Sequence, residues 1–279
     1  MHTAITQFSV SPDREANIEK ATGFVREAAQ SGAEIILLPE LFSGPYFPRT
    51  EDAAFFSWAE AATQSPTLQH FSRLARELGV VLPISFFEKD GQLYYNSVAV
   101  LDADGTCLGV YRKSHIPDGP GYEEKFYFRP GKTGFKVWDT RFGAIGVGIC
   151  WDQWFPECAR IMTLLGADIL LYPTAIGSEP TEPALDTSEP WRRAMLGHAV
   201  SNLIPIAAAN RVGIEHDQTF YGRSFICDAL GEIVAELDRT HEGIGYASFD
   251  AEEVRKTRAS FGFFRDRRPD LYLEITKDH

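Results

Sequence analysis

Short runs of apolar residues alternate along the chain with longer stretches in which apolar residues recur about every three or four positions. The short runs are typical of buried β-strands, and the periodic stretches are typical of amphipathic α-helices. Strands are predicted over residues 1–10, 34–39, 80–88, 95–102, 107–112, 141–150, 168–173 and 204–210. Helices are predicted over residues 13–31, 67–79, 154–165 and 191–202, and tight turns at Asp104-Gly105 and Leu230-Gly231 indicate two hairpins.

The order of these strands and helices favours an α/β fold. Near-continuous apolar strands are typical of sheets whose faces are covered by helices, and the two hairpins add antiparallel pairing. Residues 177–190 are rich in proline and acid and lie between a predicted strand and a helix, so we interpret them as a functional loop and not as a linker. We therefore expect one domain over residues 1–279, with a C-terminal tail from about residue 260.

The balance of charges narrows the classes of partner. A formal net charge of −12 and a sequence pI near 5.1 argue against nucleic acid, whose recognition depends on clustered lysine and arginine. No run approaches the roughly 20 apolar residues of a membrane-spanning helix, and residues 1–10 lack the features of a secretory signal, so we expect a cytoplasmic protein that does not contact membranes. The cysteines Cys107, Cys150, Cys158 and Cys227 have neither disulfide-framework nor zinc-like spacing, which predicts reduced thiols and no metal.

Three residues with reactive side chains each follow a predicted strand. Glu40 comes after Ile-Ile-Leu-Leu-Pro, Lys113 after Cys-Leu-Gly-Val-Tyr-Arg, and Cys150 after Ala-Ile-Gly-Val-Gly-Ile. Strand ends in an α/β fold meet at a crevice, where the sheet fixes the geometry of the side chains. Taken singly, a cysteine after an apolar strand is more often an inert buried thiol than a nucleophile. A single glutamate or lysine in that position is more often a solvated charge at the end of the strand. Spacing alone therefore leaves a site shared by the three residues as a conjecture.

The sequence around these residues resembles the nitrilase superfamily of carbon–nitrogen hydrolases. The motifs that carry the resemblance are PELF at 39–42, YRKSHIP at 111–117 and GICWDQWFPE at 148–157. The resemblance implies a four-layer αββα sandwich and a catalytic triad of Glu40, Lys113 and Cys150. A fourth motif, residues 117–131, resembles the family loop that carries a second glutamate, which implies that Glu124 is also catalytic, although composition alone would make it part of a charged surface turn.

These residue types suit the hydrolysis of a poor electrophile such as an amide or ureido carbonyl. Free cysteine has a pKa near about 8.5, so we expect Glu40 to take the proton of the Cys150 thiol and later return it to the leaving nitrogen. Lys113 and the backbone N–H of Trp151 are expected to form the oxyanion hole, and Glu124 to orient Lys113. The scheme needs no cofactor and no metal, and the sequence has no GxSxG motif that would support a serine nucleophile.

Further motifs resemble the N-carbamoylputrescine amidases, one family of that superfamily. They are IPDGPGY at 116–122, YPTAIGSEP at 172–180, TFYG at 219–222 and FRDRRPDLY at 264–272. The resemblance implies that the substrate is a small ureido amine, N-carbamoylputrescine, which yields putrescine, ammonia and carbon dioxide. We expect Glu179 to pair with the distal ammonium and Tyr46 and Phe47 to wall the aliphatic chain, while an ordinary solvated loop carboxylate is an equally good interpretation of Glu179.

Other functions stay open at this point. Residues 42–47, Phe-Ser-Gly-Pro-Tyr-Phe, differ from the family's Phe-Glu-Thr-Pro-Tyr-Phe, and loops of this kind discriminate among ureido amines, ureido acids and amides. The alternatives are a β-ureidopropionase, another amidase, or a catalytically silent scaffold. The resemblance also implies a homo-oligomer built on a dimer, in which the C-terminal tail packs at a subunit interface.

Overall fold

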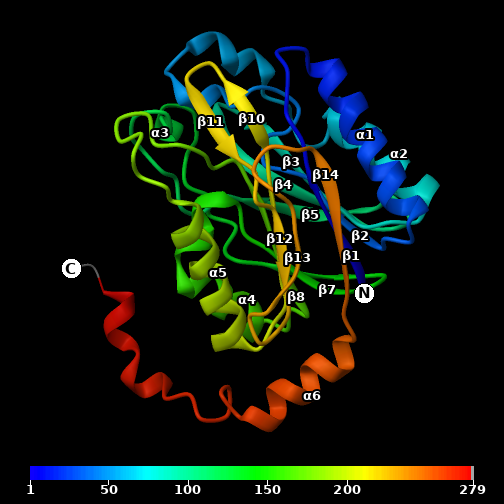
Figure 1. Ribbon diagram of the computed structural model, residues 1–279, viewed down its shortest axis with the longest axis vertical. Coiled ribbons are helices and arrows are strands. Elements are labelled where there is room, and N and C mark those ends of the chain that lie inside the picture. The colour runs from blue at the N-terminus through cyan, green and yellow to red at the C-terminus, as the bar shows by residue number, and fades with distance from the viewer. Residues whose placement is uncertain (278–279) are drawn as a thin grey trace.

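Two layers of β-structure form the centre of the protein, which we describe over residues 1–277 from a computed structural model (Figure 1). The first layer combines two three-stranded sheets. One sheet has the order β14 (Gly243–Ser248), β1 (His2–Gln7), β2 (Ile35–Leu37), and the other has the order β3 (Leu82–Asp90), β4 (Leu93–Leu101), β5 (Cys107–Arg112). Hydrogen bonds from Ile36 N to Val81 O and from Val81 N to Glu34 O join these two sheets. The second layer is one sheet in the order β13 (Ile233–Glu236), β12 (Phe225–Cys227), β9 (Ile206–Asn210), β8 (Ile169–Thr174), β7 (Gly143–Val147), β6 (Val137–Thr140).

Helices cover the outer face of each layer. The first layer carries α1 (Arg14–Gln30) and α2 (Pro66–Leu78), and the second carries α4 (Pro156–Leu164) and α5 (Ser188–Asn202). The remaining elements are α3 (Glu124–Tyr127), α6 (Ala251–Phe261), the hairpin of β10 (Val212–Glu215) and β11 (Gln218–Tyr221), and the 3-10 helices η1 (Phe47–Arg49), η2 (Ala53–Trp58), η3 (Cys150–Trp154), η4 (Pro269–Leu271) and η5 (Leu273–Thr276). Within residues 1–277, every helix is too short or too polar to cross a membrane.

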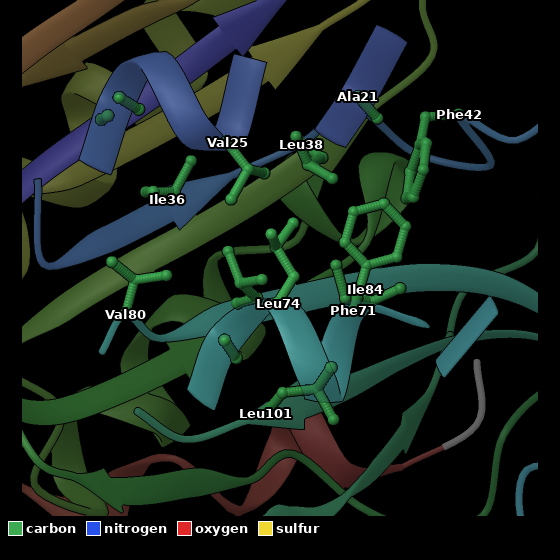
Figure 2. Close-up of a cluster of buried hydrophobic side chains, with 14 of the residues drawn as sticks. Ala21, Val25, Ile36, Leu38, Phe42, Phe71, Leu74, Val80, Ile84 and Leu101 are labelled. Atoms are coloured by element: carbon green, nitrogen blue, oxygen red, sulfur yellow. The ribbon is translucent and has the colours of Figure 1, made fainter. Parts of the chain in front are cut away.

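Three apolar cores separate the four layers. The central core lies between the two β-layers, where Val98 of the first and Leu171 of the second are both fully buried. One outer core packs α1 and α2 against the first layer, and Figure 2 shows Val25 of α1 and Leu74 of α2 in that cluster. The other packs α4 and α5 against the second layer and contains Trp191. This order of layers confirms the predicted αββα sandwich.

Local sequence signals set the ends of the outer helices. Asp13 caps α1 by accepting hydrogen bonds from the N–H groups of Glu15 and Ala16. Gly79 ends α2 in the left-handed conformation, with φ of 68°, which a residue without a Cβ adopts at little cost. The strands and helices predicted from apolar periodicity are present, with their ends shifted by a few residues.

The sequence analysis did not predict β6, the β10–β11 hairpin, β14, α6, the short helix α3 or the 3-10 helices. The sequence of α6 lacks the apolar stripe of a helix that packs on a core, and none of its residues is fully buried. It is held instead by Arg255, whose guanidinium bonds both oxygens of the buried Asp168 carboxylate at 2.8 and 2.6 Å. Because an ion pair docks this helix, hydrophobic periodicity could not reveal it.

Candidate active site

Three chain segments bring Glu40, Lys113 and Cys150 together at one end of the β-layers. Glu40 lies beyond β2, Lys113 directly follows β5, and Cys150 opens η3 beyond β7. The Glu40 N–H donates to Thr174 O at 3.3 Å, and the Lys113 N–H donates to Asn96 O at 2.8 Å. All three reactive side chains are buried. The backbone of the sandwich therefore positions a carboxylate, an ammonium and a thiol in one enclosed site.

The Lys113 ammonium is the centre of this site. It donates to Glu40 Oε1 at 2.9 Å and to Oε1 and Oε2 of Glu124 at 2.9 and 2.7 Å. An ammonium has three N–H donors, so these bonds use all of them. Burial opposes the charge on Lys113, but the carboxylates of Glu124 and Glu40 outweigh it and raise the pKa of Lys113 above its ordinary value. Lys113 is thus a fixed positive charge.

Glu124 opens α3 and is fully buried, so it is not part of a solvated surface turn. Besides its bonds to Lys113, it accepts a hydrogen bond from the Tyr46 hydroxyl at 2.6 Å. Burial raises the pKa of Glu124 to about 7, the nearby Lys113 charge opposes the rise, and the Glu40 carboxylate adds to it. Glu124 therefore connects Tyr46 to the central ammonium.

The two oxygens of Glu40 have different surroundings. Oε1 accepts hydrogen bonds from Lys113 Nζ at 2.9 Å and from Asn96 Nδ2 at 2.6 Å. Oε2 is buried and has no hydrogen-bond partner within residues 1–277. Leaving a buried polar atom unpaired is costly, so such an atom calls for an explanation in a native structure. Oε2 is the oxygen of Glu40 that remains available to accept a proton.

The backbone at Cys150 is strained, with φ of 41°, a left-handed conformation that a residue with a Cβ seldom adopts. Its Sγ is 3.8 Å from Ala175 O. Burial raises the pKa of the thiol well above its ordinary value, Glu40 raises it further, and Lys113 opposes both effects. These effects favour the thiol over the thiolate, so a nearby base would assist attack by Cys150. The N–H of Trp151 lies in the first turn of η3, where N–H groups lack an acceptor within the helix.

Asp152 holds the turn that carries Cys150. Its Oδ2 accepts hydrogen bonds from the Ile149 N–H at 2.9 Å and from the Tyr111 hydroxyl at 2.7 Å. Its Oδ1 accepts from the His115 N–H at 3.1 Å. Tyr111 and His115 flank Lys113 in the sequence. Asp152 therefore ties the turn of the thiol to the segment of the ammonium.

A buried ion pair fixes the segment that carries Glu40 and Tyr46. Arg211 donates to Glu40 O at 2.8 Å, to Leu41 O at 3.1 Å and to Glu215 Oε1 at 2.7 Å. Glu215 in turn accepts a hydrogen bond from the Tyr46 N–H at 2.6 Å. Leu41 has φ of 48°, so the pair surrounds a strained turn directly after the carboxylate.

A cavity of about 150 Å³ opens onto Cys150. Its lining residues are Tyr46, Pro117, Asp118, Gly119, Pro120, Tyr122, Glu124, Cys150, Trp151, Ile176, Glu179 and Thr181. No lysine or arginine is among these described residues, whereas Asp118, Glu124 and Glu179 are all acidic. Burial and the nearby Glu182 carboxylate raise the pKa of Glu179. The cavity is therefore suited to a ligand with a positive charge away from its reacting carbon.

Of the three residues expected to bind the substrate, Phe47 is the one that lies away from the cavity at Cys150. It does not line the cavity at Cys150 but is buried in an aromatic cluster, with its ring centroid 5.0 Å from that of Phe87 and 4.9 Å from that of Tyr127. Packing of large aromatic rings against one another accounts for its burial. The structure therefore places Phe47 away from this cavity, whereas Tyr46 and Glu179 line it.

Sequence reasoning also missed three residues that support the site: Asn96, Asp152 and Arg211. Asn96 carried the clearest signal, because it and its neighbour Ser97 are polar residues directly before the apolar run that ends strand β4. A buried polar side chain in a strand needs a partner, and its partner here is Glu40. Arg211 gave no comparable signal, since its partner Glu40 is 171 positions away in the sequence.

Known proteins resemble this chain in sequence. Residues 2–259 match the carbon–nitrogen hydrolase family. The chain is 55% identical to an N-carbamoylputrescine amidase from Arabidopsis thaliana over 95% of this chain and 92% of that protein. It is 50% identical to a citrullinase from Francisella tularensis over 99% of this chain and 98% of that protein.

A solved structure gives the same result for the fold. It is a mutant of the amidase from Nesterenkonia sp. AN1 that shows covalent addition of the acetamide moiety of fluoroacetamide at its active-site cysteine. It superimposes with a TM-score of 0.82 at 25% sequence identity and covers 98% of this chain and 96% of that chain. The chain belongs to the carbon–nitrogen hydrolase family of the nitrilase superfamily. It is an amidohydrolase that acts on carbon–nitrogen bonds, which confirms the predicted class of enzyme.

Proposed function

We propose that this protein hydrolyses N-carbamoylputrescine to putrescine, ammonia and carbon dioxide. The observation that carries the proposal is the cavity at Cys150, whose charged lining residues are all acidic. Such a cavity favours a ureido amine, which ends in an ammonium, over a ureido acid, which ends in a carboxylate. The identity to proteins named N-carbamoylputrescine amidase and citrullinase supports a ureido substrate.

We assign the first half of the reaction to Glu40, Lys113 and Cys150. Glu40 Oε2 takes the thiol proton as Sγ bonds to the ureido carbon. All three protons of Lys113 are already in hydrogen bonds, so Lys113 stabilises the oxyanion through its charge and the Trp151 N–H supplies a hydrogen bond. The tetrahedral intermediate then breaks a C–N bond, and Glu40 returns the proton to the leaving nitrogen.

The second half of the reaction regenerates the thiol. The first half leaves a thiocarbamate on Cys150, and Glu40 takes a proton from the water that attacks its carbonyl carbon. The C–S bond breaks and the sulfur recovers a proton from Glu40. The released carbamic acid loses carbon dioxide and leaves the second product, which is putrescine if ammonia departed first and ammonia if putrescine did. No step consumes an oxidant, a reductant or a cofactor.

The acidic lining also separates the two ureido substrates named above. We propose that Glu179 pairs with the distal ammonium of N-carbamoylputrescine, with Asp118 adding to the negative potential. Citrulline carries the same ureido group and an ammonium, but it also has an α-carboxylate. That carboxylate would meet acidic side chains without a cation among the lining residues, and like charges brought together disfavour binding.

Ammonia release tests this proposal. Purified protein is given N-carbamoylputrescine, citrulline and N-carbamoyl-β-alanine in parallel, and Cys150→Ala is the control. The proposal expects release chiefly from N-carbamoylputrescine and none from the control. Cys150-dependent release chiefly from citrulline or N-carbamoyl-β-alanine would overturn the substrate and keep the mechanism. Failure of the wild type with all three would favour another amide substrate or a silent scaffold.

We also propose that the chain forms one domain that assembles into a homo-oligomer built on a dimer. Apolar side chains are exposed on α4 and along the C-terminal tail, namely Ile161, Leu164, Leu165, Phe263, Leu271, Leu273 and Ile275. An open hollow of about 390 Å³ lies between α4, α5 and this tail. A second subunit would bury this surface. Light scattering of the wild type and of Leu164→Glu checks the proposal, since the variant should be smaller.

The free cysteines bear on where the enzyme works. We propose a cytoplasmic location, because Cys150 must stay a reduced thiol to act as nucleophile. All four cysteines are free in the structure, and Cys107 is exposed. An oxidising compartment would leave an exposed thiol open to unwanted pairing. Fractionation of cells that express the protein checks this location.

A further inference from the structure

Asn96 contacts the catalytic machinery twice. Its side-chain Nδ2 donates to Glu40 Oε1 at 2.6 Å, and its backbone oxygen accepts the Lys113 N–H at 2.8 Å. Asn96 lies on β4 and is fully buried. It does not line the cavity at Cys150. It can therefore influence the reaction only through the residues that it holds.

The chemistry of the two groups fixes which way the Asn96 amide points. An ionised carboxylate only accepts hydrogen bonds, so the amide must present its NH2 group, and not its oxygen, to Glu40. Lys113 Nζ donates to the same oxygen, Oε1. Two donors on Oε1 leave Oε2 as the oxygen without a partner within residues 1–277.

We propose that Asn96 is a positioning residue that gives the two oxygens of Glu40 separate tasks. Oε1 is held by Asn96 and Lys113, and Oε2 is kept for the proton of Cys150. With Lys113 as its only donor, the carboxylate could rotate and share both oxygens with the ammonium. It would then lose the free oxygen that the thiol needs. The inference deepens the proposed function and rests on it, because it assigns Glu40 the part of the base.

Asn96→Ala removes the donor and should lower kcat about 100-fold, the cost typical of a catalytic group misplaced by about an ångström. KM should change little, because Asn96 does not contact the cavity. Ser97→Ala is the matched control. Ser97 is the next residue of β4, is equally buried, and donates a hydrogen bond to Glu88 Oε2 at 2.6 Å. Its loss should destabilise the fold to a similar degree and leave kcat within about threefold.

Asn96→Asp supplies a readout that a purely structural role would not move. When the new carboxyl is protonated, its O–H can donate to Glu40 Oε1 in the same place as the amide. When it is ionised, it repels the Glu40 carboxylate and cannot donate. The activity of the variant relative to the wild type should therefore rise as pH falls. A relative activity that does not depend on pH would contradict the positioning role.

Alkylation of Cys150 by iodoacetamide tests the inference without a substrate. Its rate reports how readily the thiol loses its proton, so Asn96→Ala should slow it strongly, while Ser97→Ala should not. Peptide mapping confirms that Cys150 is the labelled site. Equal slowing in both variants, or no slowing in Asn96→Ala, would overturn the role of Asn96. A wild type that alkylates fast but hydrolyses no ureido compound would refute the proposed function and leave the positioning of Glu40 intact.

Discussion

Glu179→Gln removes the charge that we assign to the distal ammonium and keeps the size of the side chain. Two unit charges about 4 Å apart interact by about 4 kcal/mol at the effective dielectric near a protein surface. Glu179 is only partly buried, and solvent screening reduces that figure to about 1.5–2.5 kcal/mol. A difference of about 1.4 kcal/mol is a factor of ten. The value of kcat/KM for N-carbamoylputrescine should therefore fall about 10- to 70-fold.

Steady-state ammonia release measures this loss, and the chain offers a matched control. Glu182 belongs to the same loop, is exposed and does not line the cavity, so Glu182→Gln should change kcat/KM by no more than about twofold. N-carbamoylbutylamine has the same ureido group and carbon chain without the ammonium, and Glu179→Gln should not slow its hydrolysis. An equal loss with both substrates would refute the pairing, because Glu179 would then act on the structure of the loop.

Three further predictions follow from the site and the fold. Lys113→Met should lower kcat by at least about 100-fold in a folded protein, since it removes the charge that we assign to the oxyanion; kinetics and circular dichroism check this. Tyr46→Phe removes a hydrogen bond that stabilises the ionised form of Glu124, so the pKa of Glu124 should rise above about 7 and the acid limb of kcat/KM should move to higher pH. Arg255→Met leaves the buried Asp168 carboxylate without its cation, which should lower the free energy of unfolding by about 1–2 kcal/mol in urea, because the exposed arginine is screened.

Each of these predictions has an outcome that would contradict it. Turnover by Lys113→Met within about tenfold of the wild type would remove Lys113 from the oxyanion site. An acid limb that stays in place, or moves to lower pH, in Tyr46→Phe would show that Glu124 does not control it. Lys256→Met is the control for Arg255, because Lys256 is the neighbouring residue of α6 and its ion-pair partner within residues 1–277 is the exposed Glu252. Equal stability changes in these two variants would refute the anchoring by Asp168.

Glu40, Lys113 and Cys150 could be selected from the sequence as candidates because each belongs to a local motif beside a strand. Glu40, Lys113 and Cys150 follow their predicted strands, and the motifs around them resemble one superfamily. The outer helices were equally predictable, since α1 and α2 carry apolar residues at helical spacing and end at recognisable caps. These features depend on neighbours within a few residues, which a single sequence displays directly.

The rest depends on contacts between distant segments. Composition alone makes Glu124 part of a surface turn, and only its family motif indicated a place in the site, where the structure shows it buried. Asn96 meets Glu40 from 56 positions away, and Arg211 reaches the same residue from still further along the chain. Phe47 lies next to a cavity residue but packs among other aromatic rings. The order of apolar and polar residues along a sequence shows where each kind of side chain occurs, but it does not show which distant residue a side chain will contact.

The most direct test of the Glu40–Lys113–Cys150 mechanism is the mass of the enzyme during turnover. Protein mixed with N-carbamoylputrescine and quenched in acid is weighed intact, then digested to find the modified peptide. The mechanism predicts a thiocarbamate on Cys150, with a mass gain equal to the substrate less whichever amine leaves first, and no adduct in Cys150→Ala. Ammonia release by Cys150→Ala at the wild-type rate, without any adduct in the wild type, would contradict it.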